Sequence, residues 1–255
     1  RASEQGERVC IIEQERIGGS CLHRGLYPIK FGLSLLREEQ SKFKSNGVID
    51  SEKLFQKITD SMQSLAQRWE QKLIESGVTV IIGRGSLLSS LLVQVDLNDK
   101  TIDIGTKKII IATGSSPLPL PTLPFETDII IPVDDIFKNH FIPKRVFIMG
   151  ASTNAYELSS FYQLLGSKVF LSSEESRLFP DQDPDIIVAL EQSLKVLKIK
   201  ALLGKQILSY FKNDDFLDIT LVGGVKFQVD KIISNLDRKG NLDNLQCEEM
   251  GVRVG

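Results

Sequence analysis

The chain has 255 residues, 42% hydrophobic and 25% charged, which is enough for a sizeable core in one large or two ordinary domains. Its 31 basic and 33 acidic side chains leave a formal charge of −2, so nothing electrostatic favours a nucleic-acid partner. No run approaches the roughly 18 apolar residues that a membrane span needs. We therefore expect no membrane partner and a small molecule as the ligand.

The cysteines are too few and too scattered for the disulfide framework of a secreted protein. They are Cys10, Cys21 and Cys247, and together with His23 and His140 they match no zinc-site spacing. We expect no metal site and a reducing, cytoplasmic location. The opening residues RASEQGERV carry no export signal and no methionine, so we expect the sequence to start part-way through a longer protein.

The first half of the sequence begins with a short apolar run, residues 7–12 (ERVCII), which ends at Glu13. This pattern is typical of a buried parallel strand with an acid at its carboxyl end. A glycine turn follows, and then an expected helix. Between Glu52 and Gly77, apolar residues recur at intervals of three and four, which predicts one long helix with a core-facing stripe.

Four strand-like runs follow this helix, and a proline-rich passage ends the first half. The runs are residues 78–82, 91–95, 101–104 and 108–112. Because helices and strands alternate, the sequence predicts the α/β class. The passage 117–124 (PLPLPTLP) can continue neither element, since each proline removes a backbone donor, and we interpret it as the exit from the first domain.

The second half repeats the order of strand, glycine turn, helix and strand. Its expected elements are a strand at 145–150, a helix at 154–165, a strand at 168–172, a helix at 184–197, and strands at 216–221 and 225–234. Gly166 lies where a helix-stop glycine is expected. The first three elements therefore predict a βαβ unit.

Two turns and one cysteine could carry chemistry. In the turn GASTNA, Gly150 and Ala155 fit a dinucleotide-binding turn, but Ser152 stands where glycine lets a pyrophosphate approach. Ser173 stands where an acid that holds a ribose hydroxyl is expected. On these residues alone, the turn is either a nucleotide site or a packing turn of a βαβ unit.

The other two features are the strand-like KKIIIATGSSP (107–117) and Cys21. The strand would end in Thr113, Gly114 and Ser115, where glycine lets the backbone approach a ligand or a neighbouring strand. Cys21 follows two glycines at an expected helix start and has cations nearby, which favours a reactive thiolate. A small buried side chain at that position is the alternative.

These features occur in one known order, which resembles the pyridine nucleotide-disulfide oxidoreductase family and, within it, the dihydrolipoamide dehydrogenases. The stretches that carry the resemblance are VCIIEQERIGGSCLHRGLYPIK (9–30), IIIATGSSPLPLP (109–121), RVFIMGASTNAYELSSFYQLLGSKVFLSSEESRLFPDQDPDI (145–186) and ISNLDRKGN (233–241). The resemblance implies an α/β fold of two Rossmann-like domains that bind FAD and NAD(P), the first incomplete. The implied division is 1–118 for the FAD domain, 119–143 for a linker, 144–240 for the NAD(P) domain and 241–255 for the return to the FAD domain.

The resemblance also implies roles for individual residues. Glu13 would contact the adenosine ribose of FAD, and Gly19, Ser20, Cys21 and Lys30 would lie along the flavin. Thr113, Gly114 and Ser115 would approach the phosphates or the adenine side of FAD. In the second domain Gly150, Ser152 and Ala155 match the pyrophosphate turn, Glu157 matches an acid at the start of the following helix, and Arg238 matches the arginine that closes the domain.

The sequence departs from the family pattern at several of these places. The family has a second redox cysteine five positions after the first, where this chain has Leu26, so we expect no internal redox disulfide. Ile29 replaces a serine and Gly240 a proline. The first dinucleotide turn, expected before Ala2, is not in the sequence, nor are the family's dimerisation domain and catalytic histidine, although family members are homodimers.

Three functions remain open from the sequence. The first is an FAD-dependent oxidoreductase that moves hydride between NAD(P)H and a disulfide substrate, which the absence of a second cysteine would impair. The second is a flavoprotein resembling the soluble transhydrogenases, which keep the first cysteine and lose the second. The third is a non-catalytic paralogue that binds nucleotides or proteins, which the changes at Ser152, Ser173, Leu26 and Gly240 favour.

Overall fold

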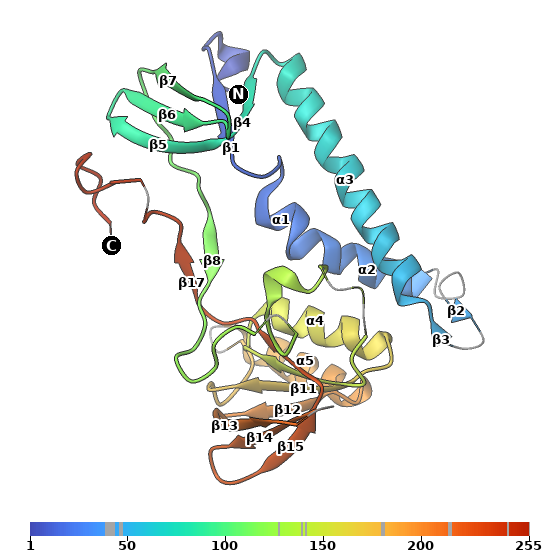
Figure 1. The fold of residues 1–255 in the computed structure, drawn as a ribbon. Coiled ribbons are helices and arrows are strands. Elements are labelled where there is room, and N and C mark those ends of the chain that lie inside the picture. The colour runs from blue at the N-terminus through green and yellow to red at the C-terminus, as the bar shows by residue number, and fades with distance from the viewer. Residues whose placement is uncertain are drawn as a thin grey trace. The chain divides into compact units, whose positions relative to one another are not determined.

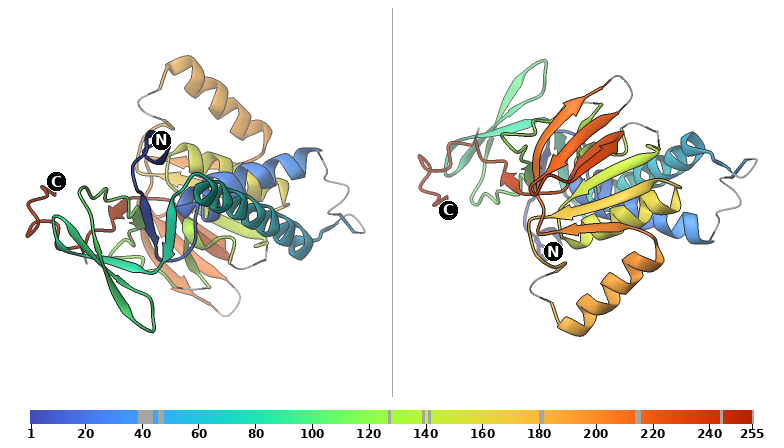
Figure 2. Two further views of the ribbon diagram at one scale, coloured as in Figure 1. Left: turned by 90° about the horizontal axis from the view of Figure 1, so that it is seen from above. Right: turned by 90° about the horizontal axis from the view of Figure 1, so that it is seen from below.

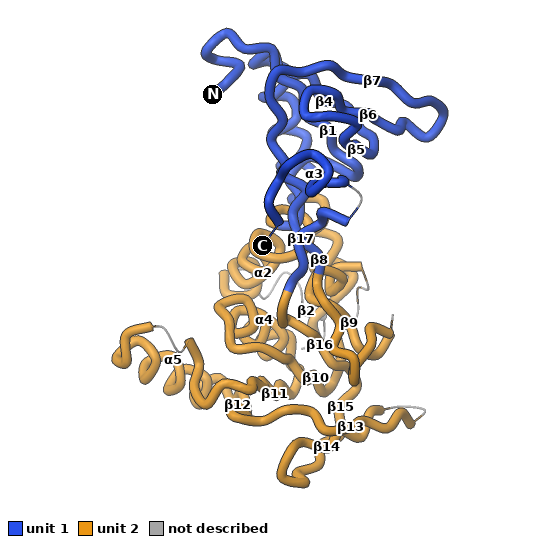
Figure 3. Tube along the Cα trace, turned by 90° about the vertical axis from the view of Figure 1, so that its left-hand side faces the viewer, with its two compact units in different colours: residues 1–20, 61–116, 238–255 blue, residues 21–60, 117–237 orange. Residues whose placement is uncertain are grey.

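The computed structural model describes residues 1–38, 44–45, 48–126, 128–138, 140, 142–179, 182–213, 216–243 and 245–254 (Figure 1). The chain forms two compact units (Figure 3). Unit 1 comprises residues 1–20, 61–116 and 238–255, and unit 2 comprises residues 21–60 and 117–237. Among the described residues, no helix combines the length and the apolar character needed to cross a membrane.

Unit 1 contains a short parallel sheet and a separate antiparallel one. A 3-10 turn, η1 (Ser3–Gln5), precedes β1 (Cys10–Glu13), which pairs in parallel with β4 (Thr79–Ile82). The antiparallel sheet consists of β5 (Arg84–Ser89), β6 (Leu92–Asp96) and β7 (Thr101–Gly105). Two further strands, β8 (Ser115–Pro117) and β17 (Arg238–Gly240), pair with each other.

The prediction of a strand at 108–112 is wrong. No described strand pairs with this segment, and the sheet of β1 and β4 has no third member. The alternation of side chains is nevertheless present: Ile109 and Ile111 pack against a cluster around Leu87 and Cys247, whereas Ile110 is 89% exposed. The segment is therefore half-buried on one side only and not buried as a strand of this composition was expected to be, and a strand also needs a hydrogen-bonded neighbour, which the apolar pattern does not supply.

Two helices follow β1 where one was expected. They are α1 (Gly19–His23) and α2 (Leu26–Glu38), separated at residues 24–25. The two-residue strands β2 (Lys44–Ser45) and β3 (Val48–Ile49) pair before α3 (Ser51–Glu75). The predicted long helix is confirmed by α3, whose start is capped by the Asp50 carboxylate, which accepts a hydrogen bond from the backbone N–H of Lys53.

Unit 2 is built on a five-stranded parallel sheet of order β12-β11-β10-β16-β9. Its strands are β9 (Ile130–Pro132), β10 (Arg145–Met149), β11 (Lys168–Ser173), β12 (Lys200–Leu203) and β16 (Lys231–Ser234). The helices α4 (Thr153–Leu164) and α5 (Pro184–Val196) connect β10 to β11 and β11 to β12, which confirms the βαβ prediction. The 3-10 turn η3 (Val133–Asp135) follows β9.

A second, antiparallel sheet covers the other side of the parallel one. It consists of β13 (Ile207–Lys212), β14 (Leu217–Leu221) and β15 (Lys226–Val229). Figure 1 shows it on the side opposite α4 and α5, and Figure 2 shows α5 beside the parallel sheet in both views. Phe147 and Phe170 of the parallel sheet join Ile219 and Val229 of the antiparallel sheet in one buried cluster, which is the core between the two layers.

The single strand predicted at 225–234 is divided between the two sheets. The chain turns at Asp230, whose carboxylate accepts hydrogen bonds from the backbone N–H of Arg145 at 2.8 Å and from the Arg145 side chain. The Asp230 N–H in turn donates to the carbonyl of Arg145. Because these contacts fix a corner between β15 and β16, each half of the run joins a different sheet.

The helices α2 and α4 pack closely within unit 2, and a glycine permits the contact. A Cβ built on Gly32 of α2 would lie 2.6 Å from Cε2 of Phe161 on α4 and 3.0 Å from Cδ1 of Ile58 on α3. Phe161 is fully buried and contacts the rings of Phe55, Phe137 and Tyr162. Gly32 therefore sets the distance between the helices, because any side chain there would push a buried ring out of its place.

Replacing Gly32 by alanine tests this contact. Alanine is favoured over glycine inside a helix by about 1 kcal/mol, so an open position would gain stability. We expect Gly32→Ala to lower the free energy of unfolding by about 1–3 kcal/mol, because overpacking outweighs the helix preference. Urea unfolding measures the difference. Gly105→Ala is the control, since a Cβ there meets nothing within 4 Å, and equal stability for the two variants would contradict the prediction.

Candidate functional site

Cys21 lies on the short helix α1, where its side chain is exposed and its thiol is free. Leu26, five positions later, is the first residue of α2. Cys10 and Cys247 are free as well, so the structure contains three thiols and no disulfide. The position of the expected redox partner therefore holds an aliphatic side chain, which cannot be oxidised to a disulfide.

Lys30 and Glu157 form an ion pair where α2 packs on α4. The Lys30 ammonium lies 2.6 Å from Glu157 Oε1, with the lysine side chain 52% exposed and the glutamate side chain 15% exposed. The second carboxylate oxygen, Oε2, is buried and accepts no hydrogen bond from any described residue. A buried acceptor without a donor is unfavourable, so this oxygen could accept a hydrogen bond from a ligand or a water molecule.

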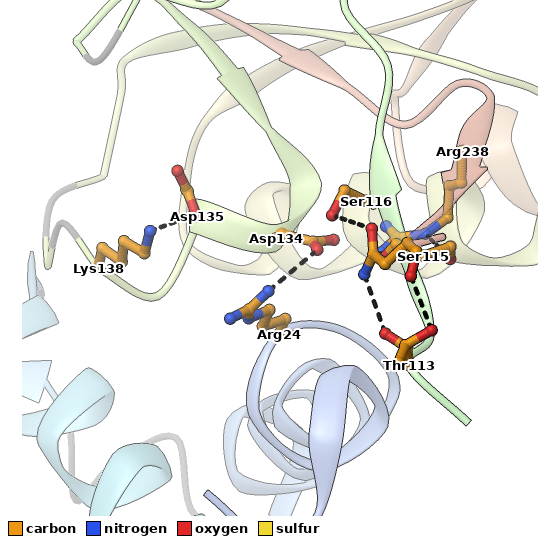
Figure 4. Close-up of polar contacts among 9 residues, drawn as sticks. Arg24, Thr113, Ser115, Ser116, Asp134, Asp135, Lys138 and Arg238 are labelled. Atoms are coloured by element: carbon orange, nitrogen blue, oxygen red, sulfur yellow. Dashed lines mark hydrogen bonds and ion pairs between the residues drawn. The ribbon is translucent and has the colours of Figure 1, made fainter. Parts of the chain in front are cut away.

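A second ion pair, which the sequence did not indicate, holds the break between α1 and α2. Arg24 lies at this break, and its Nη1 is 4.0 Å from Oδ2 of Asp134 in η3 (Figure 4). The Asp134 side chain is 9% exposed. The pair joins residues 110 positions apart in sequence, so only the folded chain reveals it.

The segment Thr113–Ser116 is held by Arg238 of β17 and by Asn241, which follows that strand. Arg238 donates to the hydroxyl of Ser115 at 2.9 Å and to its carbonyl at 2.6 Å (Figure 4). The Asn241 side chain donates to the Thr113 carbonyl and accepts from the Ser116 hydroxyl, and its backbone N–H donates to the Gly114 carbonyl. Three residues predicted near FAD therefore lie together with Arg238, and Asn241 joins them.

The remaining residues predicted near FAD in unit 1 are Glu13, Gly19 and Ser20. Glu13 ends β1, and its Oε1 accepts a hydrogen bond from the backbone N–H of Glu15 at 2.9 Å. Gly19 has φ of +55° and open space where a Cβ would be. Ser20 is exposed on α1. Lys30 and Cys21 belong to unit 2, although Cys21 directly follows Gly19 and Ser20 on α1.

The turn after β10 is held by hydrogen bonds from two sides. Ser152 is the N-cap of α4, and its hydroxyl accepts from the backbone N–H of Ala155 at 3.4 Å. The same hydroxyl accepts from the side-chain amide of Asn235, which follows β16, at 2.7 Å. Gly150 has φ of +128°, and a Cβ there would lie 2.4 Å from the Asn235 carbonyl oxygen. Glycine at 150 is therefore required by both its conformation and its neighbour.

Asn235 also belongs to this region, although no sequence motif singles it out as a candidate. Its only signal was its place directly after a strand, at the carboxyl end of the parallel sheet. Of the residues expected at a pyrophosphate turn, Gly150 lies in the turn, Ala155 is fully buried in the first turn of α4, and Ser152 is the N-cap.

Ser173 ends β11 and is buried. Its hydroxyl accepts from the backbone N–H of Glu175, and its carbonyl accepts from the N–H of Lys205. The neighbouring Ser172 hydroxyl donates to the Lys205 carbonyl. The loops after β11 and β12 are thus tied together at the position where an acid was expected to hold a ribose.

Thiol titration tests the state of the cysteines. We expect protein prepared without reductant to show three thiols after unfolding, because all three cysteines are free. In the folded state Cys21 should react before Cys247, which is buried. Partial burial raises the pKa of the Cys10 thiol, so its reaction rate should keep rising with pH above the ordinary cysteine range. Fewer than three thiols after unfolding would contradict this assignment.

Replacing Lys30 by methionine tests the buried pair. The change leaves the largely buried Glu157 carboxylate without a cation, and we expect a loss of about 1–2 kcal/mol in the free energy of unfolding. Lys138→Met is the matched control, because Lys138 pairs with Asp135 at 2.7 Å with both side chains largely or partly exposed. Such a pair contributes about 0–1 kcal/mol. Equal losses in urea unfolding would show that Glu157 does not depend on Lys30.

Known proteins are similar to this chain over nearly its whole length. The dihydrolipoyl dehydrogenase of Chlamydia muridarum is 26% identical over 261 residues, which cover 98% of this chain and 56% of that protein. The dihydrolipoyl dehydrogenase of Thermus scotoductus is 28% identical, with 100% of this chain and 57% of that protein covered. The chain therefore spans a little over half the length of these relatives.

Solved structures show the same fold. LpdA of Mycobacterium tuberculosis is 20% identical and superposes with a TM-score of 0.88, covering 100% of this chain and 58% of that one. RclA of Escherichia coli, a HOCl-induced flavoprotein disulfide reductase, gives a TM-score of 0.84 at 20% identity, covering 99% of this chain and 56% of that one. The model of the family Pyridine nucleotide-disulphide oxidoreductase matches residues 1–255. This chain belongs to the pyridine nucleotide-disulphide oxidoreductase family.

Proposed function

We propose that this chain is the cofactor-binding part of a flavin-dependent oxidoreductase that exchanges hydride with NAD(P)H without an internal disulfide relay. The observation that carries the proposal is the α2–α4 contact. Helix α2 follows Cys21 and bears Lys30, and α4 begins at the pyrophosphate turn and bears Glu157. One packed interface therefore joins residues proposed for both cofactors.

The residues present fit a flavin in this role. When bound, FAD would accept and return a hydride equivalent, which a side chain cannot do. Lys30 would present a partly exposed ammonium held in place by Glu157, and the orphaned Glu157 Oε2 is an acceptor still open to a donor. Gly19 and Gly114 leave open space where a Cβ would lie. Glu13 and the segment from Thr113 to Ser115 would hold the adenosine and phosphate parts.

The turn before α4 fits the pyrophosphate of NAD(P). The first N–H groups of a helix lack intrahelical acceptors and attract an anion. The small Ala155 keeps the first turn of α4 free of bulk, and Gly150 lets the chain turn sharply. Arg238, in the other unit, fixes Ser115. We retain residues 1–118, 119–143, 144–240 and 241–255 as the proposed FAD domain, linker, NAD(P) domain and return segment.

Leu26 supports the absence of a disulfide relay. A relay needs two cysteines whose Cα atoms lie within about 7 Å, and the chain has leucine at the motif's second position. Cys21 would then act beside the flavin as a single thiol. A non-catalytic nucleotide-binding paralogue remains the second candidate, and the replacement of an acid by Ser173 is the observation that favours it.

Flavin content and thiol counting together test the proposal. We expect the purified protein to bind added FAD, to lose the visible flavin absorption anaerobically with NADH or NADPH, and to show three thiols both before and after reduction. A disulfide relay would instead gain a pair of thiols on reduction. Protein that takes up no FAD would favour the non-catalytic candidate. A gain of thiols would contradict the absence of a relay.

A further inference from the structure

The parallel sheet of unit 2 indicates where a ligand would bind. In open α/β sheets, ligands bind outside the carboxyl ends of the strands at the point where the strand order reverses. That point lies at β10, because the chain continues from β10 to β11 and β12 on one side, whereas β16 and β9 lie on the other. The crevice is therefore bounded by the residues that follow β10 and β16.

The residues that follow these two strands are joined to each other. Ser152 follows β10, Asn235 follows β16, and the amide Nδ2 of Asn235 donates to the Ser152 hydroxyl at 2.7 Å. This hydrogen bond lies at the N-cap of α4, where the rule for open α/β sheets places the crevice. An anion that binds the N–H groups of α4 would therefore have to share this place with the two side chains.

The backbone on both sides of this bond is fixed. The Asn235 N–H donates to the Met149 carbonyl at 3.0 Å, and the Asn235 carbonyl oxygen lies against Gly150, with no room for a Cβ. The side chains are less constrained, because Ser152 is exposed and Asn235 is half-buried. Opening the bond therefore requires rotation of the Asn235 side chain and no movement of the sheet.

We infer that the Asn235–Ser152 hydrogen bond obstructs the proposed dinucleotide site. This hydrogen bond must break before a pyrophosphate reaches the N-terminus of α4. The inference rests on the proposed function, since it concerns the same NAD(P) site. Binding of the dinucleotide then includes the breaking of one neutral hydrogen bond. Removing the bond in advance should tighten binding by about two- to tenfold.

Direct binding measurements test whether this hydrogen bond lowers the affinity for a dinucleotide. NADH and NADPH are titrated into the protein by calorimetry, and FAD content is recorded for each preparation. We expect Asn235→Ala and Ser152→Ala each to bind the dinucleotides about two- to tenfold more tightly than the unaltered chain. Because both variants remove the same bond, the double variant should bind no more tightly than the better single variant.

Asn213→Ala is the matched control. Its side-chain amide donates to Asp218 Oδ2, also at 2.7 Å, in the hairpin between β13 and β14 of the same unit. Its loss should leave dinucleotide affinity unchanged. Adenosine, which carries no phosphate, should bind equally to all variants. Circular dichroism confirms that each variant is folded, and a gain in affinity is a result that misfolding cannot produce.

Three results would overturn the inference. Weaker binding by Asn235→Ala would show that Asn235 contacts the ligand, and unchanged binding would show that the hydrogen bond does not obstruct the site. No binding by any variant would show that the site takes no dinucleotide. The proposed function fails separately, on flavin. If the variants bind NADH or NADPH more tightly but take up no FAD, the inference stands and the proposed function fails.

Discussion

The closeness of α2 to α4, which Gly32 permits, is the constraint on which the proposed site depends. The buried Phe161 ring occupies the space that any larger residue at 32 would need. Near this contact Lys30 reaches Glu157, and the two helices bring the segment after Cys21 to the helix that follows the turn at Gly150. The helix separation thus determines whether an ammonium and a carboxylate on different helices can meet.

The sequence predicted well those elements whose pattern is local. Helix α3, the βαβ unit and the turn at Gly150 follow from apolar spacing, caps and glycine, which act over a few residues. The predicted strand at 108–112 failed because pairing depends on a distant neighbour. The run at 225–234 was divided because Asp230 contacts Arg145, 85 positions away. In both segments, long-range hydrogen bonds decided the outcome.

The candidate site shows the same division between local and distant information. Lys30, Gly150 and Ala155 are candidates because motif spacing singles them out. Asn235 and Asp134 could not, because their partners, Ser152 and Arg24, become neighbours only through the order of the strands and the packing of η3. Ser152 replaces a glycine of the dinucleotide-binding motif, and it also has a local role as the N-cap of α4.

The two compact units are interwoven along the chain. Unit 1 takes residues from the start, the middle and the end of the sequence, and unit 2 takes the two stretches between them. Neither unit is therefore one uninterrupted segment, and no single cut in the gene would separate them. A recombination event that exchanged one unit for a foreign counterpart would have to join the new piece at several places.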